Sequence, residues 1–298
     1  MQFTDTNQIT LSNADPLPFH GYRQVKATGG FERGTPESYS TIEHFYQSEK
    51  FRGVDESFRK FIMSLPTARE ARKAARKRID VRPDWEQIRN RVMATGIWFK
   101  LLEHDRYSQA LLANPLLAED AYAFRDHYWG DLRKDVSIGF YRRILLDYRE
   151  RRRNGIMRVV ITGSSSFTNQ EFFNDALRVL FKRRMPDEIL INCDRGTDAM
   201  AERWAISHCI PVRHFPLRGS QSKVDRTRRA NDVLRVATHA VIFWKGKSTR
   251  IAEFAQATKE RDLPTRIFKL DESDNVIGAP KGRRPAAAPR AVPPSVRT

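Results

Sequence analysis

Residues 157–163 are the most constraining segment of the chain, an apolar and largely β-branched run that ends in glycine. Such a run is typical of a strand buried on both faces of a parallel sheet. Similar runs alternate with segments of helical periodicity, which predicts strands over 188–193 and 240–244 and helices over 170–183, 198–208 and 251–260. This alternation predicts a parallel sheet covered by helices, a Rossmann-like α/β arrangement.

The residues before this sheet have a different pattern. After loops and brief strands over residues 1–40, apolar spacing predicts helices over 41–51, 56–63, 67–79, 85–103 and 107–112. A charged stretch at 149–155 and a shift to Pro, Ala and Arg after Leu270 mark the expected boundaries. The predicted fold class is therefore α+β, with a mostly helical domain at 1–154, an α/β domain with a parallel sheet at 155–271, and a disordered basic tail at 272–298.

The net charge of +17 favours anionic partners, because such a field attracts polyanions whatever the fold beneath it. Nucleic acid or a phosphorylated ligand is the expected partner, although the basic run at 69–78 fits a solvated helix face equally well. No run of about 18 apolar residues occurs and no leader-like segment begins the chain, so no membrane association is expected. Cys193 and Cys209 lie in segments predicted to form core, which favours reduced thiols and a cytoplasmic protein. The oligomeric state stays open.

Three polar residues share one face of the helix expected at 41–51. Glu43, Gln47 and Lys50 follow one another at i, i+4 and i+7, with Tyr46 beside them. A carboxylate, an amide and an amine aligned among aromatic side chains can form the floor of a polar pocket. The same spacing fits an amphipathic helix with a surface Glu/Lys pair, so spacing alone leaves both interpretations open.

Residues 43–51 resemble the signature of the NADAR family, whose members carry a similar E-H-x-Y-Q-x-x-K-F stretch. Further matches follow in the family's order: residues 11–13, residues 84–85 leading into Arg89, Met93 and Lys100, and Glu119 before the D-x-x-W-G motif at 126–130. Residues 138–146 depart from the family's usual G-x-N-x-L-G stretch. The missing Asn is expected to alter substrate preference or reduce activity if it normally contacts ligand.

The resemblance implies cleavage of an N-glycosidic bond to ribose, with neither a metal nor a cofactor. Two substrate settings are known for the family: phosphorylated early intermediates of riboflavin synthesis, and ADP-ribose attached to guanine in nucleic acid. Such chemistry needs a carboxyl group to protonate the leaving nitrogen or activate water, and a carboxylate or nucleophile to stabilise or trap the ribose cation. The expected catalytic residues are Glu43, Lys50 and Asp126.

Lys50 has a second expected role, because an amine desolvated among aromatic residues loses basicity and can add to the aldehyde of an opened ribose. Trp85 and Trp129 are expected to stack on a base or flank the sugar, with core filling as the other interpretation. The full set of expected substrate contacts is Asn13, Gln47, Trp85, Lys100, Trp129 and Gly130.

Three small-residue loops follow the expected strands, at 163–169, 195–198 and 244–250, and would gather at the carboxyl ends of the strands. Backbone N–H groups in such loops favour a phosphate. Their order, T-G-S, R-G-x-D and W-x-G-K-S, is similar to the SLOG group of Rossmann-like domains, whose relatives sense or process nucleotides. Residues 192–194 depart from a His-Gly-Gly type stretch, and residues 246–248 do not meet the P-loop spacing.

The SLOG resemblance spans residues 157–270 and favours binding over catalysis, with Glu253 as the candidate if this half hydrolyses its ligand. The expected nucleotide contacts are Gly163, Ser164, Arg195, Gly196, Asp198, Arg228, Asn231, Gly246, Ser248 and Thr249.

Together these features predict an N-glycosidase that removes ADP-ribose from guanine in nucleic acid or acts on a related NAD-derived ligand. The expected partners are ADP-ribose or an NAD-derived nucleotide, with nucleic acid as a further partner. Two alternatives stay open: a nucleotide sensor or nucleic-acid-binding protein of a defence system, and an N-glycosidase that acts on riboflavin-pathway ribosylamino intermediates.

Overall fold

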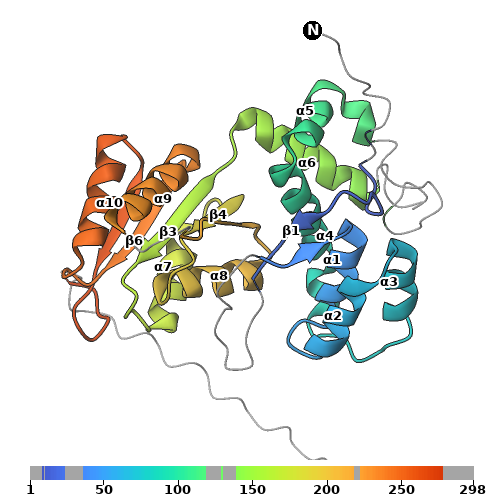
Figure 1. Cartoon of the computed structure of the whole chain (residues 1–298), viewed down its shortest axis with the longest axis horizontal. Coiled ribbons are helices and arrows are strands. Elements are labelled where there is room, and N and C mark those ends of the chain that lie inside the picture. Colours follow the sequence, from blue (N-terminus) through green and yellow to red (C-terminus); the bar gives the residue numbers. More distant parts are fainter. Residues whose placement is uncertain are drawn as a thin grey trace, which may run out of the picture.

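The computed structural model describes residues 9, 11–23, 36–118, 129, 139–217 and 222–277. A helical part comes first and a sheet covered by helices follows it (Figure 1). This order confirms the predicted fold class, an α+β part followed by a Rossmann-like α/β part. Residues 278–298 of the predicted basic tail lie outside the described residues.

The helical part contains a two-stranded antiparallel sheet and six α-helices among its described residues. Its elements are β1 (Phe19–His20), β2 (Ser38–Tyr39), α1 (Ile42–Glu49), α2 (Glu56–Ser64), α3 (Ala68–Ala75), α4 (Trp85–Glu103), α5 (Asp105–Ala113), the 3-10 helix η2 (Pro115–Ala118) and α6 (Phe140–Asn154). The charged stretch at 149–154, expected as a boundary, forms the end of α6.

Local sequence explains where these helices begin. Thr41, Asp55 and Thr67 each accept a hydrogen bond from the backbone N–H three residues later, which caps the start of α1, α2 and α3. Helix α1 packs closely on α4, because Gly96 leaves room for Phe45: a Cβ at Gly96 would lie 2.8 Å from the Phe45 ring. This packing fixes the orientation of α1, whose eight residues are all buried.

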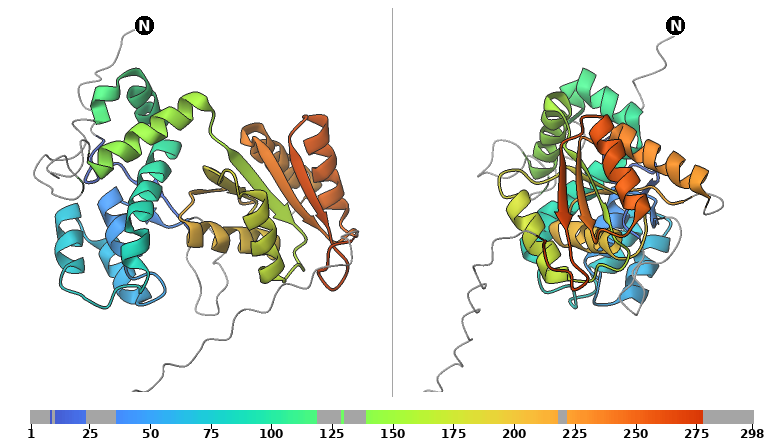
Figure 2. Two further views of the ribbon diagram at one scale, coloured as in Figure 1. Left: turned by 180° about the vertical axis from the view of Figure 1, so that it is seen from behind. Right: turned by 90° about the vertical axis from the view of Figure 1, so that its left-hand side faces the viewer.

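The second part is a five-stranded, wholly parallel sheet with strand order β5-β4-β3-β6-β7. Its elements are β3 (Arg158–Gly163), α7 (Gln170–Leu180), β4 (Glu188–Ile191), α8 (Thr197–His208), β5 (Val212–His214), α9 (Lys223–Val236), β6 (His239–Trp244), α10 (Thr249–Glu260) and β7 (Thr265–Lys269). Val159 and Ile161 face the core beneath α7 and α8, whereas Val160 faces α9 and α10. Helices therefore cover both faces of the sheet (Figure 2).

The chain continues in an ordered turn past the expected boundary at residue 271. Leu270 forms a β-bridge with Val276, and the buried Asp274 pairs with Lys245 at 2.6 Å. Asp274 also accepts hydrogen bonds from Thr168, which ties this turn to the loop after β3.

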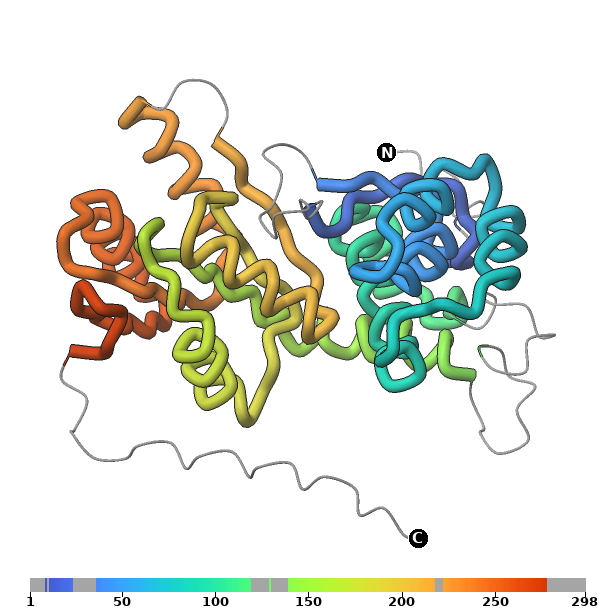
Figure 3. Tube along the Cα trace, turned by 90° about the horizontal axis from the view of Figure 1, so that it is seen from below, coloured from blue at the N-terminus to red at the C-terminus, as the bar shows by residue number. Residues whose placement is uncertain are grey.

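The two parts lie side by side (Figure 3). One cluster of buried apolar residues continues from the helical part into the sheet part. The Tyr22 hydroxyl donates to the Ile210 carbonyl at 2.9 Å, and the Thr95 hydroxyl donates to the Cys209 carbonyl at 2.6 Å. Arg151 at the end of α6 pairs with Asp187 at 2.6 Å. Within the described ranges, none of the helices combines the length and the apolar composition that a membrane span needs.

Candidate functional site

The Glu43 carboxylate lies in the first turn of α1, is only 2% exposed and accepts N–H groups from three residues. Gln47 Nε2 donates to Oε1 at 2.8 Å, and Asn13 Nδ2 donates to Oε2. Arg72 binds both oxygens, through Nε at 2.8 Å and Nη2 at 3.1 Å. Both carboxylate oxygens are therefore engaged as hydrogen-bond acceptors, which holds the group in one orientation.

Lys50 places an amine beside this carboxylate. Its Nζ lies 5.7 Å from the centre of the Tyr46 ring and 5.5 Å from the centre of the Trp85 ring, both within cation–π range. Burial lowers the pKa of Lys50 below its ordinary value, and the nearby Glu43 charge opposes this shift only in part. The uncharged, nucleophilic form of the amine is therefore more populated at Lys50 than at a surface lysine.

Aromatic rings surround the polar groups. The Tyr46 ring contacts Trp85 at a centroid distance of 5.0 Å and Trp129 at 5.5 Å, the second pair perpendicular. Both tryptophans are buried. Eight residues thus form one group, the Glu43 cluster: Asn13, Glu43, Tyr46, Gln47, Lys50, Arg72, Trp85 and Trp129.

The Glu43 cluster unites most of the residues expected to act on substrate. Asp126 and Gly130, the two other expected site residues of the motif at 126–130, lie outside the described residues. Gln47 offers a further feature, since its Oε1 atom is buried and has no hydrogen-bond partner among the described residues. A buried acceptor of this kind is costly unless a ligand or water satisfies it.

Lys100, expected to contact substrate, lies apart from the Glu43 cluster in a buried ion pair. Its Nζ donates to the Asp15 carboxylate at 2.6 Å and to the Asp15 carbonyl at 2.8 Å. These bonds hold the segment that carries Asn13, so the contacts of Lys100 are those of a positioning residue.

Arg72 is the residue of the cluster that sequence reasoning missed. It lies on α3, 29 positions after Glu43, inside the basic run that fits a solvated helix face. Its side chain is 35% exposed, so it reaches from the surface to the buried carboxylate. Helix periodicity relates residues within one helix only, and no sequence signal identified this pair.

In the sheet part, several expected nucleotide contacts hold the loops together. A Cβ at Gly163 would lie 2.2 Å from the Phe243 carbonyl oxygen, and one at Gly196 would lie 2.5 Å from the Ser165 carbonyl oxygen. Gly196 also has a φ of +65°, which favours glycine. Ser164 Oγ accepts from the Lys245 N–H at 3.1 Å. These small residues have a packing role that the sequence patterns do not separate from phosphate binding.

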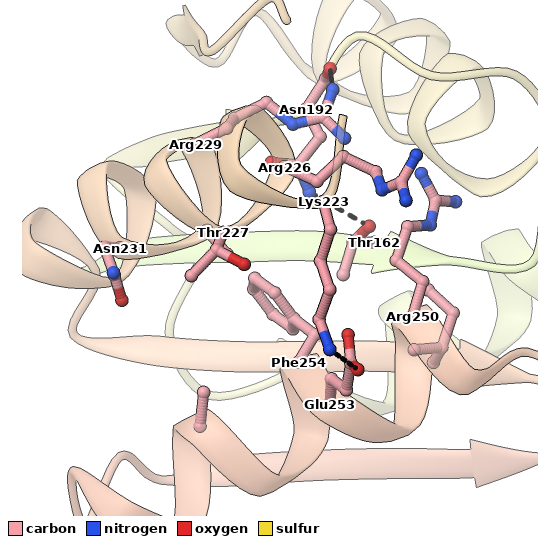
Figure 4. A pocket seen from close by; sticks show the side chains of 13 residues that line it. Thr162, Asn192, Lys223, Arg226, Thr227, Arg229, Asn231, Arg250, Glu253 and Phe254 are labelled. Atoms are coloured by element: carbon pink, nitrogen blue, oxygen red, sulfur yellow. Dashed lines mark hydrogen bonds and ion pairs between the residues drawn. The ribbon is translucent and has the colours of Figure 1, made fainter. Parts of the chain in front are cut away.

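The remaining expected contacts are dispersed. Arg195 and Thr249 line a cleft of about 810 Å³, and Asn231 lines a smaller pocket of about 120 Å³ that shares residues with it (Figure 4). Arg228 points outward, 69% exposed and 3.8 Å from Asp225. Ser248 caps α10, and Gly246 adopts a φ of +82°.

Asp198 lies beneath the cleft rather than in its lining. It is 1% exposed, and its Oδ2 accepts from the Asp194 N–H at 3.1 Å. Burial, with the nearby Asp194 charge, raises the pKa of Asp198 to about 7. Its contacts make it a residue that shapes the loop after β4.

Comparison with known proteins bears on the helical part. Residues 2–141 match the model of the NADAR domain. The chain is 29% identical over 96 residues to the N-glycosidase YbiA of Escherichia coli (strain K12), a match that covers 32% of this chain and 59% of that protein. It is 28% identical over 120 residues to the N-glycosidase Npun_R5314 of Nostoc punctiforme, with 39% and 76% covered.

The NMR structure of the E. coli protein YbiA is similar at 25% identity with a TM-score of 0.36, covering 52% of this chain and 83% of that chain. The chain spans 59% of the length of the YbiA relatives from E. coli and Shigella boydii. The expected NADAR domain is confirmed at residues 2–141, and the SLOG resemblance stays a prediction.

Proposed function

We propose that the NADAR domain at residues 2–141 gives this chain N-glycosidase activity towards a ribose N-glycosidic bond, and that the Glu43 cluster is its active site. The observation that carries the proposal is the meeting of a fixed carboxylate, an amine of lowered pKa and aromatic walls. Relatives named N-glycosidases support the reaction class. The boundary with the sheet part is proposed at residues 154–155.

In this mechanism the Glu43 charge stabilises the positive charge that develops at the ribose C1′ as its bond to the leaving nitrogen breaks. Asp126 is the proposed acid that protonates this nitrogen. Lys50 adds through its free amine to C1′ and loses a proton, and ring opening passes a proton to the ring oxygen and leaves an imine. Water then hydrolyses the imine, which releases the sugar and restores the amine.

Two further groups suit a ribosyl substrate. Gln47 Oε1, which has no partner in the part of the chain that the structure describes, would accept a hydrogen bond from a ribose hydroxyl, and Trp85 or Trp129 would offer an aromatic face to the base.

The proposed substrate is ADP-ribose attached to guanine in nucleic acid, because α3 borders the Glu43 cluster with cationic side chains. Arg69, Lys73, Arg76 and Lys77 are exposed on this helix and at its end, and Arg72 links it to the carboxylate. Several exposed cations strengthen binding to a polyanion, because each can pair with a phosphate. A single phosphorylated intermediate of the riboflavin pathway would contact fewer of them.

The direct test incubates the full chain with an oligonucleotide that carries ADP-ribosylated guanine and measures free ADP-ribose by chromatography. Release is expected from the wild type and from Glu70→Gln, an exposed carboxylate on α3, but not from Glu43→Gln. Equal release by Glu43→Gln would refute the assigned site. Turnover of riboflavin-pathway ribosylamino intermediates alone would keep the glycosidase and overturn the substrate.

An alternative proposal makes the chain a nucleotide sensor or nucleic-acid-binding protein of a defence system, with the Glu43 cluster as a binder only. The observation that favours it is the cationic cleft in the sheet part. We propose ADP-ribose or an NAD-derived nucleotide as the ligand of that part. Titration calorimetry with NAD, ADP-ribose and cyclic nucleotides tests this proposal, and an absence of heat with all of them would remove it.

A further inference from the structure

The cleft of about 810 Å³ beside the sheet has a strongly cationic lining. It lies where the loops after β4 and β5 meet α9 and the start of α10, and its volume falls in the range of small-molecule sites. Among the described residues of the lining, only Asp194 and Glu253 are acidic. The cationic side chains are Arg23, Arg195, Lys223, Arg226, Arg229 and Arg250.

The two acidic residues are already engaged. Asp194 accepts from Arg229 at 3.2 and 3.1 Å and also pairs with Arg250, so one carboxylate is shared by two guanidinium groups. Glu253 lies 3.5 Å from the Lys223 amine. The lining therefore keeps an excess of positive charge, and an anionic ligand would relieve the repulsion between its cations.

Arg226 and Arg250 place two guanidinium groups close together in the cleft. They come from different helices, α9 and α10, and Figure 4 shows their guanidinium groups turned towards each other. Arg229 is buried and is held by the Asn192 carbonyl at 2.8 Å as well as by Asp194. Two planar forks carried by separate helices suit two neighbouring tetrahedral anions better than one.

Arg23 comes from the helical part, yet it lines the same cleft. It is buried, and its Nε donates to Glu202 on α8 at 2.6 Å while its backbone N–H donates to the other carboxylate oxygen at 3.0 Å. Glu202 is further held by His214 at 2.8 Å. The cleft is thus complete only where the two parts of the chain meet.

We propose that this cleft is a binding site for the diphosphate group of a small molecule, gripped by Arg226 and Arg250 and bordered by Arg23 from the helical part. The cleft takes Ser165, Arg195 and Thr249 from the small-residue loops at the strand ends, whereas Gly163, Ser164 and Gly196 of those loops are not in its lining. The proposed diphosphate site deepens the nucleotide ligand proposed above for the sheet part, and it stands whether or not the Glu43 cluster is a glycosidase.

The test is titration calorimetry of the full chain with inorganic pyrophosphate, orthophosphate and ADP-ribose. Pyrophosphate and ADP-ribose are expected to bind, and orthophosphate to bind at least tenfold more weakly than pyrophosphate. Arg226→Ala and Arg250→Lys are each expected to weaken pyrophosphate binding by about tenfold, because each loses one bidentate contact. Arg228→Ala is the matched control, since it removes the same charge from α9 at an outward-facing position.

Three outcomes would overturn the proposal. One is no binding of pyrophosphate or ADP-ribose by a chain whose melting curve shows that it is folded. Another is an equal loss with Arg228→Ala and Arg226→Ala, which would reduce the effect to net charge. The third is binding of a single-stranded oligonucleotide that depends on Arg226 while pyrophosphate does not bind, which would make the surface a nucleic-acid site.

Discussion

The Glu43 cluster and the cationic cleft have opposite electrostatic character. In the Glu43 cluster one carboxylate is saturated by N–H donors and faces an amine and aromatic rings, so a developing positive charge would be stabilised there. In the cleft, Asp194 is shared between two guanidinium groups and further cations line the walls. The first arrangement suits bond cleavage at a ribose carbon, and the second suits retention of an anion.

The two sites also differ in how the fold builds them. One eight-residue helix, α1, carries Glu43, Tyr46 and Gln47, and Lys50 follows at its end. The cleft is formed by Arg23, three loops and two helices. A substitution in one site is therefore expected to leave the other intact, so the independence of the two sites can be tested directly.

The largest expected effect is that of Glu43→Gln. The amide has nearly the same shape but lacks the negative charge, and it presents an NH₂ group to donors that the carboxylate had satisfied. We expect the rate of ADP-ribose release to fall by about 1,000-fold, at the upper end for loss of one electrostatic group. Pyrophosphate affinity, measured by calorimetry, should stay within twofold of the wild type.

Two results would break the comparison. Loss of pyrophosphate binding in Glu43→Gln, with an unchanged melting temperature, would mean that the sites are coupled. A rate within tenfold of the wild type would mean that the Glu43 charge is not needed for cleavage.

How far the sequence predicts each site follows from the same difference. The face shared by Glu43, Gln47 and Lys50 is a property of helix geometry, so spacing alone placed the three together. The pairing of Arg72 with Glu43 and the approach of Arg226 to Arg250 depend on how separate helices pack. Periodicity carries no information on such contacts.

The fold shows the same limit. Strands β3, β4 and β6 were predictable because each is an apolar run buried on both faces. Strand β5 has only three residues, and the edge strand β7 has only two apolar residues beside Arg266 and Lys269, so neither is a clear apolar run. Helix α9 is rich in charge and buries little of its surface, which hides its periodicity.

A smaller effect is expected for Lys50, and it tests whether the Glu43 cluster supplies a nucleophile. Borohydride added during turnover should reduce the imine and leave a sugar covalently bound to the wild type and to Lys60→Arg. Lys50→Arg keeps a positive charge but offers no comparable nucleophile, so trapping should vanish and the rate should fall by about 100-fold.

The pH dependence of trapping follows from burial of the Lys50 amine. Since the pKa of Lys50 is lowered, the free amine exists at a lower pH than at an ordinary lysine. The trapped fraction, measured by mass spectrometry, should therefore reach half its maximum below the ordinary value of about 10.4. A midpoint at or above that value, or a sugar trapped on Lys50→Arg, would remove Lys50 as the nucleophile.

The last expected effect is on stability rather than on rate, and it concerns Asp198, the buried acid at the cleft. Its pKa is about 7 in the folded chain against an ordinary value of 3.8, so between these values the folded chain keeps a proton that the unfolded chain has lost. The contribution of Asp198 to the free energy of unfolding must then fall as pH rises, by at most about 1.4 kcal/mol for each pH unit, and level off above pH 7.

Asp198→Asn removes the titration and can still accept from the Asp194 N–H. Denaturant unfolding should be measured from pH 4 to pH 8. The free energy of unfolding of Asp198→Asn should rise relative to that of the wild type as pH rises. Asp232→Asn, on the surface of α9, should keep a constant difference from the wild type. Parallel curves for Asp198→Asn would show that Asp198 is already ionised at low pH, and that the cleft floor carries more negative charge than its geometry indicates.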